Sequence, residues 1–309
     1  MVFLCQHNWC VACGRSWSGV VGFCGFLLFL PYTRCMMDEL HEVLQETAVL
    51  SRLSTRWLGR HYHYFPAIPS TNDYLKQRLA EVGQELPHGM VVLADYQSRG
   101  RGRLQREWVA PAGTSLLLSM LFWPDWPPEQ GNWLAMMGSV AAAEAMEELT
   151  GVSVGIKWPN DLMIELDGVW HKVSGLLLEG NLDENGRLQS AILGIGMNVN
   201  MAADQLPPAV TPATSLLIAS GHPMDRVALL VAFLARMEQY YEAAVAGTSP
   251  RPAWHDRLIT IGQMVQVSGQ MWQVKGVAEG TDEWGRLLVR AENGRLHTIA
   301  AGDVTLRPH

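Results

Sequence analysis

Hydrophobic and polar residues follow two different periods along the chain from about residue 61 onwards. Apolar positions at helical spacing predict a helix that begins near Ser70, with Thr71 or Asn72 as its cap. A second helix is expected to run from its cap, Asp225, to about Ala246. Strands interleaved with helices indicate an α+β fold, a mixed sheet with helices packed on it. Further helical patterns cover 38–53 and 133–149, and the expected strands cover 61–65, 90–94, 115–123, 154–157, 162–165, 170–179 and 188–199.

The pattern changes near residue 250, where the run Gly-Thr-Ser-Pro ends the last long helix. Short strands with close turns follow, and turn residues such as Gly269 and the Asn293-Gly294 pair separate them. This pattern predicts a small barrel. We therefore place a domain boundary near residue 255, with one domain at 36–255 and a second at 256–309. The barrel strands are expected at 264–267, 271–278, 287–290 and 296–300.

The charge and hydropathy of the chain argue against two classes of partner. The formal net charge of -7 gives no general attraction to polyphosphate. No basic patch of convincing size stands out, so no nucleic-acid partner is expected. The apolar run at 20–30 is shorter than the roughly 20 residues that span a bilayer, and it lacks the basic start of a secretory signal. No membrane partner is expected either.

All five cysteines precede residue 36, so the body of the chain has no disulfide framework. The pair Cys10 and Cys13 has no second pair downstream, and we interpret it as incidental thiols rather than as a zinc site. This cysteine usage favours the cytoplasm. Because Met36-Met37 precedes a helical pattern, residues 1–35 are expected to lie upstream of the true translation start, outside the fold.

A glycine- and arginine-rich segment, Gly-Arg-Gly-Arg at 100–103, is the first candidate for chemistry. Glycines between arginines allow backbone N–H groups and guanidinium groups to converge on one anion. Arg106 and Trp108 follow directly. Gln105 stands where the dinucleotide-binding fingerprint has its third glycine, and the chain has no P-loop motif. The segment is therefore expected to bind an anion in another way, the alternative being a solvated basic turn.

Three further segments combine charged or amide side chains with strand-like neighbours. Lys-Trp-Pro-Asn-Asp at 157–161 presents a lysine and an aspartate that could hold a phosphate and its Mg²⁺, or form a surface ion pair. Lys172 opens an apolar strand, where a lysine needs an anionic partner or a route to solvent. Gly-Ile-Gly-Met-Asn-Val-Asn at 194–200 adds glycines for close backbone approach and Asn198 for an adenine edge, or is a plain buried strand with a bulge.

In this order and spacing, these segments and the Ser-Thr-Asn triplet at 70–72 resemble the biotin protein ligase family over roughly residues 55–308. The resemblance implies a catalytic domain like that of class II aminoacyl-tRNA synthetases, followed by a small SH3-like β-barrel. It points to the single-function form without a winged-helix DNA-binding domain. The run Leu104-Gln105 departs from the family pattern, in which a further small residue is common.

The resemblance also implies a role for each matching residue. Asp161 would help to place Mg²⁺ or the acceptor lysine, and the expected catalytic residues are Arg101, Arg103, Lys172 and Asp161. The expected biotin-binding residues are Ser70, Thr71, Asn72, Gln97, Arg101, Gly102, Arg103 and Lys172. The expected ATP-binding residues are Arg103, Arg106, Trp108, Lys157, Asn160 and Asn198.

The activity implied is an ATP-dependent ligase that forms biotinyl-5′-AMP and transfers biotin to a lysine of a biotin carboxyl carrier domain. The protein would be a monomer or a homodimer. One alternative is a lipoate or octanoate ligase of the same superfamily; a covalent transferase is disfavoured because no cysteine follows residue 35. The other is a biotin-responsive repressor, for which Arg52, Arg56 and Arg60 supply only a thin basic stripe.

Overall fold

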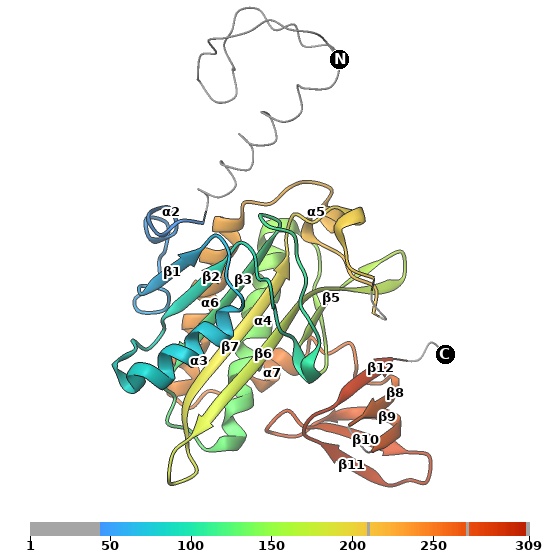
Figure 1. Cartoon of the computed structure of the whole chain (residues 1–309). Coiled ribbons are helices and arrows are strands. Elements are labelled where there is room, and N and C mark those ends of the chain that lie inside the picture. Colours follow the sequence, from blue (N-terminus) through green and yellow to red (C-terminus); the bar gives the residue numbers. More distant parts are fainter. Residues whose placement is uncertain (1–43, 209–210, 270–271, 307–309) are drawn as a thin grey trace, which may run out of the picture. The chain divides into compact units, whose positions relative to one another are not determined.

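The computed structural model describes residues 44–208, 211–269 and 272–306 (Figure 1). The expectations for residues 1–35, for the five cysteines and for the start of the 38–53 helix lie outside these residues. Within the described part, no helix is long and apolar enough to cross a membrane. Two arginines of the thin basic stripe already form ion pairs within the protein: Arg52 pairs with Asp225, and Arg56 pairs with Glu242.

The larger part of the fold is a seven-stranded sheet in the order β1-β2-β3-β7-β6-β5-β4. Strands β1 and β2 are parallel, and every other neighbouring pair is antiparallel. The mixed sheet that the sequence predicts is thus confirmed. The strands are β1 (Tyr62–Phe65), β2 (Val91–Ala94), β3 (Ser115–Phe122), β4 (Gly155–Lys157), β5 (Asp161–Leu166), β6 (Val169–Leu182) and β7 (Leu188–Asn198).

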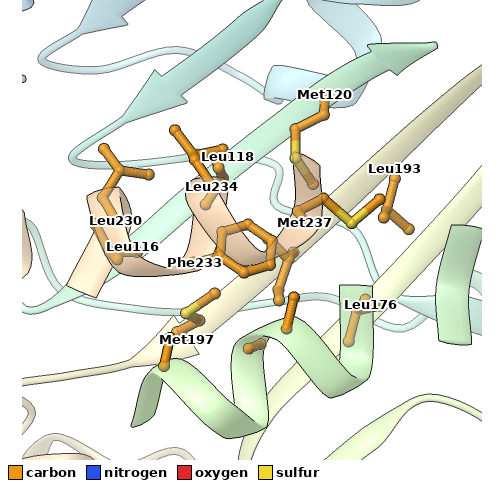
Figure 2. Close-up of a cluster of buried hydrophobic side chains, with 14 of the residues drawn as sticks. Leu116, Leu118, Met120, Leu176, Leu193, Met197, Leu230, Phe233, Leu234 and Met237 are labelled. Atoms are coloured by element: carbon orange, nitrogen blue, oxygen red, sulfur yellow. The ribbon is translucent and has the colours of Figure 1, made fainter. Parts of the chain in front are cut away.

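One face of this sheet is covered by two long helices, α4 (Asn132–Thr150) and α6 (Arg226–Val245). Alternate residues of β3, Leu116, Leu118 and Met120, point towards Phe233 and Met237 of α6 (Figure 2). Asp225 caps α6 as predicted, since its carboxylate accepts hydrogen bonds from the backbone N–H groups two and three residues on. Burial of this apolar face fixes which side chains of β3 point the other way.

The opposite face carries α3 (Thr71–Val82), which packs through Leu75 against Leu121 and Ile192. The cap of α3 is Ser70, whose hydroxyl accepts from the backbone N–H of Asp73 at 3.3 Å. The prediction of Thr71 or Asn72 as the cap was therefore wrong. A serine at this position satisfies a free N–H of the first turn, and both following residues are left to turn their side chains towards the sheet.

The remaining helical segments are short and connect the strands. The short α-helices are α2 (Glu46–Leu50), α5 (Leu216–Ser220) and α7 (Arg251–His255). The 3₁₀ turns are η1 (Gly83–Glu85), η2 (Arg103–Gln105), η3 (Pro128–Gly131) and η4 (Ala203–Gln205).

The C-terminal part is a five-stranded antiparallel sheet in the order β11-β10-β9-β8-β12. The strands are β8 (Met264–Ser268), β9 (Gln273–Thr281), β10 (Leu287–Ala291), β11 (Leu296–Ile299) and β12 (Asp303–Leu306). Four or five strands were expected, and β12 is the one whose range was not predicted. The C-terminal core is continuous with Met136 and Val140 of α4, and the Trp158 indole donates to the carbonyl of Gly285 at 2.9 Å. The C-terminal part also contributes residues of β12 to the lining of a large cavity.

Candidate active site

A cavity of about 1010 Å³ lies on the face of the sheet that carries α3. It reaches from Ser70 at the start of α3 to Asp303 at the start of β12. Every candidate residue named from the sequence lines it, although these residues are spread from position 70 to position 198. The fold thus brings all of them to one site.

The end of the cavity beside α3, which we call the α3 end, is formed by buried and half-buried polar groups that hydrogen-bond to one another. The Gln97 side-chain carbonyl accepts from the backbone N–H of Thr71 at 2.7 Å, and the Thr71 hydroxyl lies 3.1 Å from the same oxygen. Ser119 lies 2.7 Å from the Thr71 hydroxyl and 2.5 Å from the side-chain carbonyl oxygen of Asn72. Since Gln97 uses its oxygen internally, its amide nitrogen is left to face a ligand.

Two glycines of β7 are required by the side chains packed over them. A Cβ on Gly194 would lie 2.2 Å from the Asn72 side-chain oxygen, and a Cβ on Gly196 would lie 2.4 Å from the Trp108 ring. The indole of Trp108 therefore lies directly against the backbone of the sheet. Its N–H is buried and has no hydrogen-bond partner in the described part of the protein. This arrangement presents an aromatic face together with an available donor.

The opposite end, which we call the cationic end, gathers positive side chains at the edge of the sheet. Lys172 pairs with Asp161 at 2.6 Å and lies 5.5 Å from the Trp108 ring centroid. Lys157 is only 8% exposed, and its ammonium donates a long hydrogen bond to the Thr211 hydroxyl at 3.5 Å. Burial lowers the pKa of Lys157, and the negative charge of Asp161 opposes that shift. Asp161 is one carboxylate beside two lysines, and an anionic ligand would supply the second negative charge.

Arg103 is held at the cationic end by two neutral acceptors. Its guanidinium donates to the side-chain oxygen of Asn160 at 2.9 Å and to the backbone carbonyl of Gly302 at 3.2 Å. Burial lowers the pKa of Arg103, although Asp161 and Asp303 raise it. Arg106 pairs with Asp303 of β12 instead, at the surface. The C-terminal part therefore takes part in the site, which the sequence did not indicate.

Two other expected ligand-binding side chains already have partners within the protein, although the buried Nε of Arg101 has none among the described residues. The Arg101 guanidinium pairs with Asp73 at 3.1 Å and with Glu179. Asn198 is buried and donates to the backbone carbonyl of Thr214 at 3.0 Å. Gly102 has room for a side chain, since an added Cβ would meet nothing closer than 3.5 Å. Its contribution is therefore the path of the loop rather than close approach.

Two functional neighbours were missed in the sequence. Ser119 is a polar residue in the middle of the apolar strand β3, which was a readable signal. Glu179 follows three leucines on β6, and nothing local marks it as a partner of Asn72 or Arg101. Both residues contact side chains that line the cavity, although neither lines it.

Comparison with known proteins agrees with this geometry. Residues 64–198 match the biotin/lipoate A/B protein ligase family, and residues 260–307 match the biotin protein ligase C-terminal domain. The chain is 31% identical to a biotin--[acetyl-CoA-carboxylase] ligase of Mycobacterium tuberculosis, over 86% of this chain and 97% of that protein. It is 32% identical to a bifunctional ligase/repressor BirA of Bacillus spizizenii, over 85% of this chain and 79% of that protein.

The fold has solved counterparts as well. A biotin protein ligase from Aquifex aeolicus in complex with biotin and ATP superposes with a TM-score of 0.66 at 27% identity, covering 81% of this chain and all of that one. Sequence, fold and cavity therefore agree: this chain belongs to the biotin protein ligases of the biotin/lipoate A/B protein ligase family.

Proposed function

We propose that this protein joins biotin to ATP as biotinyl-5′-AMP and then transfers the biotinyl group to a lysine amine of a biotin carboxyl carrier domain. One observation carries the proposal: a single cavity joins a hydrogen-bonding α3 end, an aromatic platform and a cationic end. These are the three surfaces that a ureido ring, an adenine and a carboxylate beside phosphates require. The cytoplasm is the compartment in which we expect this reaction.

The α3 end favours biotin over lipoate. A ureido ring offers two N–H donors and a carbonyl acceptor, which Thr71, Gln97 and Asn72 can satisfy. The dithiolane ring of lipoate offers none of these groups. It would cover the half-buried side-chain amide of Gln97 without pairing it, and a polar group buried without a partner costs about 1–3 kcal/mol. Sites built from hydrogen-bonding groups reject analogues that lack the matching atoms for this reason.

The cationic end fits the chemistry of activation. An oxygen of the biotin carboxylate attacks the α-phosphorus of ATP, and pyrophosphate leaves with the electrons of the broken P–O bond. Lys172, Lys157 and Arg103 would stabilise the negative charge that develops on the phosphate oxygens. Trp108 would support the adenine, with Asn160, Asn198 and Arg106 around it. No protein nucleophile is required.

Transfer needs a neutral acceptor amine. The acceptor lysine attacks the carbonyl carbon of the anhydride, AMP leaves, and the amine loses a proton whose pKa is about 10.4 in water. The carboxylate of Asp161 lies beside Lys172 at the cationic end and would orient the incoming amine or take up its proton. The amide product then no longer binds as an anion.

Mg²⁺ would accompany ATP, and the donors at the cationic end are compatible with it. Among residues 44–306 where the structure describes them, no three His, Cys, Asp or Glu side chains converge as a metal site. Mg²⁺ commonly uses one or two carboxylates together with substrate phosphates, and Asp161 is a carboxylate in the right place. When bound, the ion would neutralise phosphate charge.

The ligase proposal is tested by incubating the protein with ATP, Mg²⁺, labelled biotin and a biotin carboxyl carrier domain. We expect the label on one acceptor lysine, and no label when labelled lipoate replaces the labelled biotin. A carrier domain whose acceptor lysine is replaced by arginine is the matched control. Transfer of lipoate at a rate comparable to biotin would contradict the assignment of the α3 end.

A further inference from the structure

Glu179 of β6 contacts two walls of the cavity without lining it. Its carboxylate accepts from the side-chain amide of Asn72 at 2.9 Å, from Lys76 at 2.5 Å and from the Arg101 guanidinium. Asn72 belongs to the first turn of α3, whereas Arg101 belongs to the glycine- and arginine-rich loop, and both line the cavity. One carboxylate thus joins two segments that are almost thirty residues apart in sequence.

The contact with Asn72 fixes the orientation of a buried amide. An ionised carboxylate only accepts hydrogen bonds, so the Asn72 NH₂ group must face Glu179 and its carbonyl must face the Ser119 hydroxyl. Although burial opposes ionisation, the hydrogen bonds from Asn72, Lys76 and Arg101 lower the pKa of Glu179. The carboxylate is therefore charged at neutral pH.

The contact with Arg101 fixes the root of the anion-binding loop. Arg101 forms an isolated antiparallel bridge with Glu107, and the neighbouring carbonyl of Gly100 accepts from the backbone N–H of Trp108 at 2.9 Å. Asp73 and Glu179 hold the guanidinium from the α3 side. Arg103, two residues on, has no such carboxylate pair and reaches neutral acceptors instead. The two arginines of the loop therefore stand in different environments.

We infer that Glu179 is a positioning residue that ties the start of α3 to the root of the loop, and that Arg101 is its anchor rather than a ligand of the reacting anion. The inference rests on the proposed function, because the α3 end is taken to hold the ureido ring. It divides the two loop arginines: Arg101 shapes the ring site, and Arg103 contacts carboxylate and phosphate.

The test compares biotin with biotinol, the alcohol that keeps the ureido ring but lacks the carboxylate. In Glu179→Gln we expect calorimetry to show both ligands weakened by the same factor, about tenfold, as for the loss of one charge-assisted contact. The KM for ATP and the kcat at saturating biotin should stay within twofold of the parent. In Arg103→Met, by contrast, biotin should weaken several-fold more than biotinol.

Two matched variants isolate the cause. Lys76→Met removes an exposed partner of Glu179 and should leave both affinities within twofold. Asp73→Asn removes the second carboxylate on Arg101 at an exposed site and should weaken both ligands equally, by about two- to threefold. It also keeps the inference testable if Glu179→Gln fails to fold.

The outcomes separate the inference from the proposed function. If Glu179→Gln or Asp73→Asn weakens biotin but leaves biotinol unchanged, Arg101 acts on the carboxylate and the inference is overturned. Unchanged affinities for both ligands in both variants would overturn it as well. If the parent protein binds neither ligand, the proposed function itself fails.

Discussion

The two ends of the cavity differ in how their polar side chains are partnered before a ligand binds. At the α3 end, Thr71, Asn72 and Ser119 are at most 5% exposed and hydrogen-bonded to one another before any ligand arrives. At the cationic end, Lys157 and Lys172 stand together with Asp161 as the carboxylate between them. The α3 end is preorganised for a neutral polar ring. The cationic end is completed electrostatically only by an anion.

The backbone is also more regular at the α3 end than at the cationic end. The α3 end rests on the first turn of a helix and on central strands of the sheet. The cationic end includes a loop in which Leu104 adopts the left-handed region, with φ of 53°, and exposes 57% of its surface. That conformation costs a non-glycine residue roughly 1–2 kcal/mol. A ligand that reorganises the loop could relieve this cost, whereas the α3 end has little to gain from movement.

The largest effect is expected from a substitution that disrupts the cationic end alone. In Lys172→Met, single-turnover formation of biotinyl-5′-AMP should fall by about a hundredfold, because a charge-assisted contact to the reacting carboxylate contributes roughly 1.5–3 kcal/mol. Biotinol affinity should stay within twofold, because the α3 end is untouched. The exposed Lys76→Met is the control. A matching loss of biotinol affinity in Lys172→Met would show that the two ends are not separable.

The second largest effect is expected from a substitution that disrupts the α3 end. In Gly194→Ala the new methyl group would lie 2.2 Å from the Asn72 oxygen, which Ser119 and Glu179 hold in place from both ends of the amide. Overpacking of this kind costs about 1–3 kcal/mol, so biotin affinity should fall roughly ten- to a hundredfold. Gly102→Ala is the matched control, because its methyl group meets only an ordinary contact at 3.5 Å. Equal losses in both variants would argue against the packing explanation.

A smaller effect should appear in how long the intermediate is held. Arg103→Gly keeps the α3 end and both lysines, so it should still form biotinyl-5′-AMP, but its release should be about tenfold faster. Escaped anhydride acylates exposed amines, and a blot should show label on bystander proteins that the parent leaves unlabelled. Arg103→Lys should not restore retention, because a lysine lacks the planar fork of a guanidinium. Tight retention in Arg103→Gly would contradict this role.

The residues that line the cavity could be predicted from the sequence, whereas the contacts that hold them in place could not. Each anion-binding segment was visible because glycine, arginine and lysine are unusual beside apolar strands, and the order of the segments identified the family. The strand β3 was predicted from its nearly continuous apolar run, and all eight of its residues are buried. These patterns involve neighbouring residues in the sequence, so they can be recognised without knowledge of the fold.

What the sequence could not show depends on contacts between distant segments. The salt bridge between Arg101 and Glu179 exists only because the fold brings β6 next to the loop, and no spacing rule links positions 101 and 179. The short strand β12 was missed because Asp303–Leu306 has four residues and pairs with β8 from a distance in sequence. Ser70 was passed over as a cap because three capping residues stand in a row and only the packing of α3 selects among them.

The smallest expected effect concerns the charge of Lys157 and sharpens the contrast between the ends. Burial lowers the pKa of this lysine, so the ammonium that would contact the ATP phosphates is lost at a lower pH than that of a solvated lysine. Its contribution to ATP affinity is full below that pKa and disappears as the pH rises through it. The KM for ATP should therefore rise by a few-fold, up to about tenfold, on the alkaline side, while the affinity for biotinol stays constant. In Lys157→Arg the side chain remains charged throughout this range, so the rise should be absent. Lys157→Met should show the higher KM at every pH. If the parent and Lys157→Arg share the same alkaline rise, the titrating group lies elsewhere, and the cationic end owes its pH dependence to another residue or to the nucleotide itself.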